Sequence, residues 1–239
     1  MITGMKGPET EKIRSLFDSI AKDYDRLNHI LSLGIDRCWR RRALKWIVDT
    51  GESAGILDIA CGTGDLSIAI AGHSPESTSV TGLDLSEGML EVMRRKVEAA
   101  GLSDRISAIQ GSSEQMEFAD CSFDRATIAF GIRNFEDRQE ALREILRVLK
   151  PGGRLVILEL SVPSNAVLRW LYCLYFTKIL PLIGGWVSGD RAAYRYLPAS
   201  VLNFPGKEEW MAIMRDCGYC RVRHKALTFG ICRMYIGEK

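Results

Sequence analysis

A glycine turn followed by a well-spaced acid is the feature of this sequence that most directly suggests chemistry. Residues 56–67 read ILDIACGTGDLS, a pattern typical of a strand, a tight turn and the start of a helix, and Asp84 ends the next apolar run. Gly62 and Gly64 allow the backbone to turn sharply and to approach a ligand closely. An acid after the second strand can accept hydrogen bonds from both ribose hydroxyls. The pattern predicts a site for a nucleoside-containing cofactor.

The charges around this turn favour a cationic cofactor. Ser67 stands where a dinucleotide fingerprint has its third glycine, and Asp65 would place a carboxylate where a pyrophosphate docks on the helix. S-adenosylmethionine carries a sulfonium and an ammonium, which carboxylates at Asp58 and Asp65 would attract. We therefore expect S-adenosylmethionine rather than NAD. The alternative is a glycine turn needed only for chain reversal, but it leaves the spacing to Asp84 unexplained.

The composition is that of an ordinary globular enzyme. The 239 residues are 46% hydrophobic and 26% charged, enough for one sizeable domain with a small appended lobe. The net charge of +2 argues neither for nor against nucleic acid, and we expect no nucleic-acid partner. Seven cysteines without a secretory signal or an Arg-rich presequence predict free thiols in the cytoplasm. Cys217 and Cys220 form a Cys-x-x-Cys pair, but Gly218 ends the predicted helix between them and no second pair with zinc spacing exists, so we expect no metal site.

Hydrophobic periodicity indicates the elements that must position these residues. Up to residue 50 the apolar residues recur at helical spacing, which predicts an N-terminal helical cover. From residue 55 strands and helices alternate, as in a parallel sheet with helices on both faces. Asp137, with Glu140 three residues on, is the predicted N-cap of a helix. The predicted strands lie at 55–60, 79–84, 105–110, 124–130, 153–160, 220–227 and 230–237, and the predicted helices at 65–72, 87–100, 138–149 and near 207–217.

Four segments give nearly the whole chain a resemblance to a known family. They are Tyr24-Asp25-x-Leu27-Asn28 with Ser32, Gly34 and Trp39; Phe130-Gly131-Ile132-Arg133-Asn134; Arg147-Val148-Leu149-Lys150-Pro151-Gly152-Gly153 running to Glu159-Leu160-Ser161; and Ser188-Gly189-Asp190 with Ala193-Tyr194-x-Tyr196-Leu197-Pro198, Ser200 and Phe204-Pro205. The chain resembles the C-methyltransferases of quinone biosynthesis, of the demethylmenaquinone or 2-polyprenyl-6-methoxybenzoquinol type. The resemblance implies the α/β fold of class I S-adenosylmethionine-dependent methyltransferases, which is Rossmann-like and doubly wound with a mostly parallel seven-stranded sheet.

The resemblance also implies a reaction, the methylation of the quinol ring of a polyprenylated precursor. Demethylmenaquinol giving menaquinol is the first candidate. The benzoquinol of the ubiquinone pathway is an alternative, as is another lipophilic acceptor such as a sterol or a fatty acyl chain. The alternative from another class is a non-catalytic module that binds S-adenosylmethionine and regulates a partner. Such a module would need no acceptor pocket, whereas the candidate pocket residues here lie in three family-like segments.

The chain departs from the family pattern at a few positions. The family usually has methionine at Leu27, histidine at Asp36 and serine at Ala129, and it has Gly-Asn-Ala-Glu where this chain has Gly111-Ser112-Ser113-Glu114. These departures concern one or two polar contacts to the cofactor. The predicted cofactor-binding residues are Asp58, Gly62, Thr63, Gly64, Asp84, Leu85, Ser112, Ser113 and Ala129.

Arg133 is the first catalytic candidate. A quinol carbon becomes nucleophilic when the neighbouring hydroxyl loses its proton, and a free phenol has a pKa of about 10. The site therefore needs a base, or a positive charge that stabilises the phenolate. Arg133 follows a central strand and is expected to face the cleft where ligands of open α/β sheets bind, with Asn134 orienting the other ring oxygen. The alternative is that Arg133 pairs with a buried acid and Asn134 only turns the chain.

Other candidates lie on the N-terminal helices and in a late loop. Tyr24 and Asn28 share one helix face and are expected, with Asp25, to line a roof over the cofactor, although a tyrosine in such a stripe is more often core. Asp190 is a candidate carboxylate base in a Gly-Asp turn, which is also an ordinary loop signal. His29 is a weaker candidate, because a lone helical histidine is usually a surface or capping residue.

An apolar stretch at 167–186 is too interrupted to span a bilayer, because Arg169, Lys178 and Pro181 lie within it. We expect a hydrophobic wall or lid that accepts a polyprenyl tail and touches the membrane, with a buried helix or a dimer contact as the alternative. The cluster Arg37, Arg40, Arg41 and Arg42 would attract anionic lipid or simply be a solvated face. The expected location is the cytoplasm, peripheral at the inner face of the cell membrane, and a homodimer is left open. A single domain is predicted, with a cover at 1–50, a cofactor-binding core at 51–161, an apolar insertion at 162–206 and closing elements at 207–239.

Overall fold

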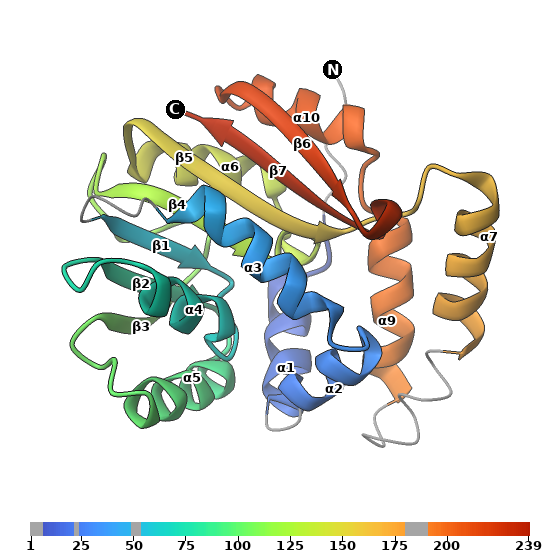
Figure 1. Cartoon of the computed structure of the whole chain (residues 1–239), viewed down its shortest axis with the longest axis horizontal. Helices are drawn as coiled ribbons and strands as arrows, with labels where there is room; N and C mark the ends of the chain where they lie inside the picture. The colour runs from blue at the N-terminus through green and yellow to red at the C-terminus, as the bar shows by residue number, and fades with distance from the viewer. Residues whose placement is uncertain (1–6, 22–23, 49–53, 180–190) are drawn as a thin grey trace.

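The computed structural model describes residues 7–21, 24–48, 54–179 and 191–239. Its strands are β1 (Gly55–Ile59), β2 (Ser79–Asp84), β3 (Ile106–Gln110), β4 (Phe123–Ala129), β5 (Leu149–Leu160), β6 (Cys220–Leu227) and β7 (Cys232–Glu238). They form one sheet in the order β3-β2-β1-β4-β5-β7-β6 (Figure 1). The neighbours from β3 to β5 pair in parallel, and β7 runs antiparallel to both β5 and β6. The predicted seven-stranded, mostly parallel sheet is confirmed.

The sheet changes its winding direction between β1 and β4. The chain moves outward from β1 to β2 and β3, and then returns to the other side of β1 with β4 and β5. In open α/β sheets this reversal leaves a crevice at the carboxyl ends of the two central strands, where ligands bind. The glycine turn follows β1 and Arg133 follows β4, so the topology brings both to the same crevice.

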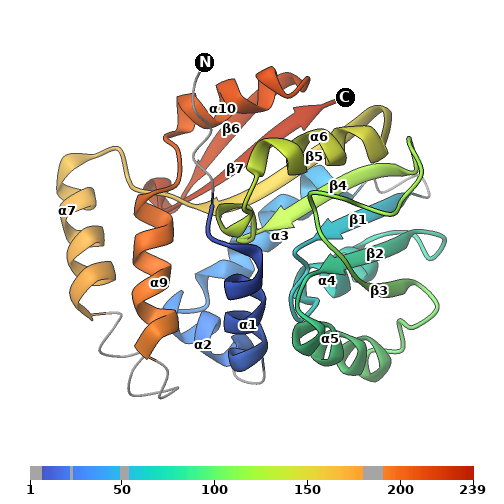
Figure 2. The ribbon, with the colours of Figure 1, turned by 180° about the vertical axis from the view of Figure 1, so that it is seen from behind.

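Helices cover both faces of the sheet and bury two apolar cores. The helices concerned are α3 (Ile35–Ile47), α4 (Asp65–His73), α5 (Glu87–Ala99), α6 (Arg138–Val148) and α10 (Lys207–Asp216). On one face α3, α4 and α5 bury residues such as Ile47 and Ile70. On the other face, seen in Figure 2, α6 and α10 bury Leu142 and Trp210. The alternation of strands and helices is therefore resolved into the expected three layers.

The N-terminal cover consists of α1 (Thr10–Ile20) and α2 (Tyr24–Leu31), followed by α3. Gly34 separates α2 from α3 with a φ of 72°, a conformation that glycine adopts readily. Figure 1 shows α1 and α2 beside the edge of the sheet at which β1 and β2 end. The cover is thus placed over the crevice.

The segment after β5 forms a small lobe at one end of the molecule (Figure 1). Its elements are α7 (Ala166–Leu174), the π-helix η2 (Tyr175–Ile179) and α9 (Arg191–Leu202). Tyr172, Phe176 and Val201 form a small apolar cluster between them. Among the helices that the structure describes, none is long and apolar enough to cross a membrane.

Several boundaries differ from the predicted ones for local reasons. β5 begins at Leu149, directly after α6, so that the Lys-Pro-Gly-Gly segment opens the strand rather than preceding it. β7 begins at Cys232 because the 3-10 turn η3 (Thr228–Gly230) precedes it. The predicted cap is confirmed: the carboxylate of Asp137 accepts from the amides of Gln139 at 3.1 Å and Glu140 at 2.9 Å.

Candidate active site

The glycine turn has a geometry that most side chains would disturb. Ala60, Gly62 and Gly64 have φ angles of 52°, 56° and 82°, in the left-handed region that L-residues rarely adopt. A Cβ on Gly64 would lie 2.6 Å from Met93 Cγ of α5. The amide of Gly62 donates to Asp84 Oδ2 at 2.8 Å. The turn and the acid predicted to act together are therefore in direct contact.

A pocket with an empty volume of about 630 Å³ opens beside this turn, and we call it the turn pocket. Five predicted cofactor residues line it: Gly62, Asp84, Leu85, Ser113 and Ala129. Apolar side chains of α1 line it as well. The carboxylate of Asp84, among apolar side chains and the polar groups of Ser86, Ser113 and Asn134, suits a nucleoside.

The other predicted cofactor residues do not line the turn pocket as the structure describes it. Asp58 and Thr63 line a small recess that adjoins it. Gly64 lies behind the turn against α5. The hydroxyl of Ser112 accepts from the amide of Glu114 at 3.2 Å and so closes a local turn.

Of the two acids expected to favour a cation, only Asp58 keeps an oxygen free. Asp58 is 1% exposed, its Oδ2 accepts from Ser67 Oγ at 2.5 Å, and its Oδ1 has no hydrogen-bond partner among the described residues. Burial raises the pKa of this carboxyl to about 7, and a cationic group beside Oδ1 would hold it ionised. Asp65 instead lies 2.5 Å from Lys96 Nζ. The expectation of two free carboxylates is wrong, because the folded chain has already neutralised one of them.

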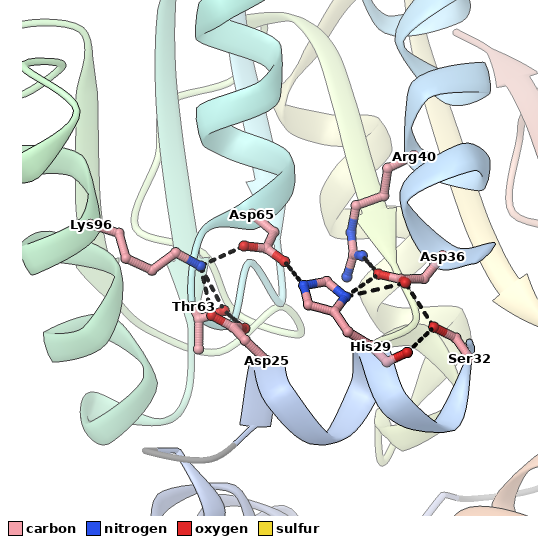
Figure 3. Close-up of polar contacts among 8 residues, drawn as sticks. All are labelled: Asp25, His29, Ser32, Asp36, Arg40, Thr63, Asp65 and Lys96. Carbon is pink, nitrogen blue, oxygen red and sulfur yellow. Dashed lines mark hydrogen bonds and ion pairs between the residues drawn. The ribbon is translucent and has the colours of Figure 1, made fainter. Parts of the chain in front are cut away.

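A chain of polar contacts fixes α2 across the glycine turn (Figure 3). Lys96 of α5 donates to Asp25 of α2 at 2.8 Å and to Asp65 of α4 at 2.5 Å. Asp25 also accepts from the hydroxyl of Thr63 in the turn. These contacts hold Tyr24 over the turn, where its Cε1 lies 3.9 Å from the position of a Cβ on Gly62.

The same chain of contacts continues through His29 to α3 (Figure 3). His29 Nδ1 lies 3.1 Å from Asp36 Oδ2, and His29 Nε2 lies 3.7 Å from Asp65 Oδ2. Asp36 also accepts from Ser32 Oγ at 2.7 Å and pairs with Arg40. Burial acts to raise the pKa of Asp36, but the Ser32 hydroxyl and the Arg40 charge outweigh this effect and hold that pKa below its usual value. His29 therefore joins helices, and it does not line either of the two large pockets among the described residues.

A second, larger pocket has an empty volume of about 1,050 Å³, and we call it the apolar pocket. Its wall consists largely of aromatic and aliphatic side chains from α2, α3, the lobe and η3, among them Trp39, Leu160, Tyr172, Tyr175, Phe176, Leu197 and Ile231. Tyr24 and Phe130 line both this pocket and the turn pocket. The two pockets therefore meet at these two side chains.

Phe130 is held at this junction in an unfavourable backbone conformation. Its φ is 63°, which costs a non-glycine residue roughly 1–2 kcal/mol. The ring lies 5.9 Å from the Trp39 ring, and the Arg40 guanidinium lies over it at 5.3 Å. Such strain is often found at functional sites, where the surrounding structure compensates for it.

Arg133 is the buried cation of the apolar pocket. Its Nη1 donates to Glu159 Oε1 at 2.7 Å and also contacts the carbonyl oxygen of Phe130. Glu159 is fully buried. Burial of the guanidinium acts to lower the pKa of Arg133, but the Glu159 charge outweighs this effect and holds that pKa above its usual value. The ion pair with a buried acid, one of the two interpretations of Arg133, is present. Arg133 nevertheless lines the apolar pocket, so the pair does not remove it from the site.

The other predicted catalytic residues are divided between the pockets. Burial raises the pKa of Tyr24, and the charge of Arg133 acts in the opposite direction. Asn28 lines the apolar pocket beside Tyr24. Asn134 lines the turn pocket, and its Oδ1 accepts from the Tyr196 hydroxyl at 2.8 Å. Asp190 lies outside the described residues.

Of two groups of residues singled out by sequence, the arginine cluster differs in part from the expectation, whereas the cysteines are the free thiols expected. Arg37, Arg41 and Arg42 are exposed on α3. Arg40 instead has a side chain that is only 14% exposed and that pairs with Asp36. The expected cluster of four surface arginines is therefore wrong for Arg40. All seven cysteines are free, with Cys217 buried and Cys220 exposed.

The sequence analysis missed several residues that tertiary packing brings to the site. Arg40 lies four residues after Asp36 on a helix, and this spacing was a usable signal for an ion pair. Lys96 lies in the last turn of an ordinary amphipathic helix, and nothing in its neighbours indicates the two acids that it joins. Tyr172 and Phe176 belong to the stretch predicted to form a hydrophobic wall or lid, but neither was singled out individually.

The chain as a whole matches one family model. Residues 5–239 match the model of the ubiE/COQ5 methyltransferase family. The chain belongs to this family. The predicted resemblance is thereby confirmed.

Curated relatives within this family are similar along their full length. The ubiquinone/menaquinone biosynthesis C-methyltransferase UbiE of Geotalea daltonii is 49% identical over 229 residues, which cover 96% of this chain and 97% of that protein. The demethylmenaquinone methyltransferase of Bacteroides fragilis is 43% identical over 233 residues, which cover 98% of this chain and 94% of that protein.

The fold of this family member is also found in more distant proteins. The crystal structure of a SAM-dependent methyltransferase from Aquifex aeolicus superposes with a TM-score of 0.62 at 19% identity, covering 83% of this chain and 88% of that chain. At this identity the likeness concerns the fold, and it agrees with the Rossmann-like arrangement described above.

Proposed function

We propose that this family member uses S-adenosylmethionine to methylate a ring carbon of a reduced polyprenyl quinol, with demethylmenaquinol as its acceptor. The observation that carries the proposal is the meeting of the turn pocket and the apolar pocket at Tyr24 and Phe130. A donor in the first pocket and an acceptor in the second would approach each other at these two side chains. The names of the Geotalea and Bacteroides relatives support a quinone-pathway acceptor.

The residues of the turn pocket and of the recess that adjoins it fit S-adenosylmethionine. Asp84 is suited to the ribose hydroxyls, the apolar wall around Leu85 and Met89 to the adenine, and the free oxygen of Asp58 to the ammonium group. Bound there, the cofactor would supply an electrophilic methyl group on a sulfonium. The chain's own residues then need only align the acceptor and make its ring carbon nucleophilic.

Arg133 is proposed to stabilise the phenolate form of the acceptor. A buried guanidinium in a largely apolar pocket interacts more strongly with a developing negative charge than it would in water. Glu159 holds this guanidinium in a fixed orientation through its 2.7 Å contact. Tyr24 and Asn134 are proposed to position the reactants, and Asp190 is proposed as the base that takes the phenol proton.

The variant Asp84→Ala should weaken binding of S-adenosylmethionine at least about tenfold, which corresponds to roughly 1.4 kcal/mol. The substitution removes the proposed ribose acceptor and also the acceptor for the Gly62 amide. Calorimetric titration measures the effect. Asp124→Ala is the matched control, because Asp124 accepts from the Gly55 amide at 2.8 Å at the other end of β1 and should leave cofactor affinity unchanged. If the wild type and a folded Asp84→Ala variant bound S-adenosylmethionine equally well, Asp84 would not be the residue that binds the ribose.

An acceptor panel tests the function itself. Purified protein is incubated with methyl-labelled donor and with reduced short-tailed naphthoquinols, reduced benzoquinols, a sterol and an unsaturated fatty acyl ester. We expect label in the naphthoquinol ring first, because that acceptor class matches the relatives' names. Transfer to the sterol or the acyl chain in its place would contradict the proposal. Donor binding without transfer to any acceptor would favour a non-catalytic binding module.

We also propose that the acceptor is taken from a membrane surface through the outer face of α7. Val167, Trp170, Leu171 and Leu174 recur at helical spacing and are 67%, 64%, 48% and 42% exposed, while the opposite face of α7 contributes Tyr172 to the apolar pocket.

Sedimentation with lipid vesicles tests this role of α7. The wild type should sediment with anionic vesicles and Trp170→Glu should not. Ile109→Glu, at the far edge of the sheet, is the control. A concentration-dependent doubling of mass without vesicle binding would assign the α7 face to a homodimer instead.

A further inference from the structure

Three buried hydrogen-bond donors of the apolar pocket have no partner among the described residues. They are the hydroxyl of Tyr172, Nε of Arg133 and Nε of Arg40. Each guanidinium is paired through another of its nitrogens, so Tyr172 is the residue whose polar group is left without any partner there. Tyr172 is 6% exposed, so water does not readily take the place of a missing partner. A buried polar group without a partner costs about 1–3 kcal/mol, and such groups are rare in folded proteins. Their presence in one pocket requires an explanation.

The packing of Tyr172 does not need its hydroxyl. Its ring lies 4.4 Å from the Phe176 ring, in the cluster that also contains Val201. A phenylalanine would make the same contacts without burying a polar group. Tyr219 shows the usual arrangement elsewhere in the fold, because its buried hydroxyl donates to the Leu142 carbonyl at 2.9 Å. Of the seven buried side-chain polar atoms without a partner among the described residues, the Tyr172 hydroxyl is the one that belongs to a tyrosine.

The charge of Arg133 acts on the Tyr172 hydroxyl, and both residues line the apolar pocket. The positive charge of Arg133 acts on the hydroxyls of Tyr24, Tyr172 and Tyr196 alike. A 1,4-quinol carries two oxygens on opposite sides of its ring, and a donor at each oxygen would fix the ring in one orientation.

We propose that the Tyr172 hydroxyl donates a hydrogen bond to one ring oxygen of a 1,4-dihydroxyarene acceptor, while Arg133 holds the opposite oxygen. This proposal rests on the quinol acceptor proposed above and adds a binding residue that selects para-dioxygenated rings. It explains why the fold retains a polar group in an apolar cluster: the group finds its partner only when the acceptor is bound. A site built to hydrogen-bond a substrate oxygen discriminates against analogues that lack it, because the site group is then left unpaired.

The variant Tyr172→Phe tests this binding role. We expect the KM for a short-tailed 1,4-naphthoquinol to rise about tenfold, with kcat and cofactor affinity little changed, since one hydrogen bond is lost. The melting temperature should stay the same or rise, because a buried unpaired hydroxyl has been removed. Tyr219→Phe is the matched control, and it should lower the melting temperature without changing the KM. A structural role of the Tyr172 hydroxyl would instead lower the stability of Tyr172→Phe, and this outcome would overturn the proposal.

An analogue with one ring hydroxyl makes the test independent of methyl transfer. Calorimetric binding of a 1,4-naphthalenediol and of 1-naphthol is measured with the wild type and with Tyr172→Phe. The wild type should bind the diol about tenfold more tightly than the naphthol, and the variant should bind both alike. If the wild type and Tyr172→Phe showed the same ratio of diol affinity to naphthol affinity, the proposed hydrogen bond from Tyr172 would be overturned. Absence of methyl transfer by the wild type would count against the proposed function alone, because the binding comparison would still be made.

Discussion

Methyl transfer should occur only to the reduced quinol, and the oxidised quinone of the same acceptor should react at least about a hundredfold more slowly. A quinone has no hydroxyl to ionise, and its ring carbons are poor in electrons, so a positive charge at Arg133 has no phenolate to stabilise. The measurement is the rate of label transfer from S-adenosylmethionine to the quinone with and without dithionite.

Two controls separate the redox state of the acceptor from effects of the reductant. Cofactor affinity is measured with and without dithionite, and an anaerobically prepared quinol is assayed with no reductant present. The seven free cysteines make the first control necessary, since a reductant acts on oxidised thiols as well. Equal rates with the quinone and the quinol would exclude the phenolate mechanism.

Arg133→Lys should keep cofactor binding and lose at least about a hundredfold in kcat, which corresponds to roughly 2.7 kcal/mol. A lysine can pair with Glu159, but its compact ammonium cannot contact Glu159 and the Phe130 carbonyl and still present a free N–H edge to a phenolate. Single-turnover rates, cofactor affinity and melting temperature are measured on one preparation.

The buried ion pair gives this prediction a definite alternative outcome. If Arg133 serves only the fold, Arg133→Lys should lower the melting temperature, cofactor affinity and turnover together. Arg138→Lys is the matched control: Arg138 is also buried, donates to the Arg133 carbonyl at 2.7 Å, and is not part of the described lining of the apolar pocket. Loss of stability is expected there with little loss of turnover. A near-normal rate of Arg133→Lys would leave Asp190 as the first catalytic candidate.

The sequence by itself determined the features that depend on neighbouring residues. The strand, turn and helix around Gly62 and the cap at Asp137 follow from hydrophobic periodicity, backbone preference and local hydrogen bonding, and the structure has all of them. The contact between the Gly62 amide and Asp84 also follows, because parallel neighbouring strands bring the ends of β1 and β2 to one edge. The glycine turn and its contact with Asp84 were therefore predictable from the sequence.

Only the tertiary structure decided the surroundings of the charged and polar groups. Asp65 was expected to attract a cation, yet Lys96 from another helix neutralises it, and Arg40 was expected at the surface, yet it lies under the cover. Arg133 was recognised, but its partner Glu159 comes from a different strand. Such contacts depend on which faces of distant segments meet, and the free energy that selects them comes from packing rather than from local pattern.

The lobe shows the same limit most directly. The spacing of Val167, Trp170, Leu171 and Leu174 is that of a helix face that would be buried, but the fold turns this face outward. The opposite face carries Tyr172 inward to the apolar pocket. Sequence periodicity states that a helix has two faces; which face the protein covers is decided by the surfaces available around it, and here those surfaces form the pocket beside Arg133.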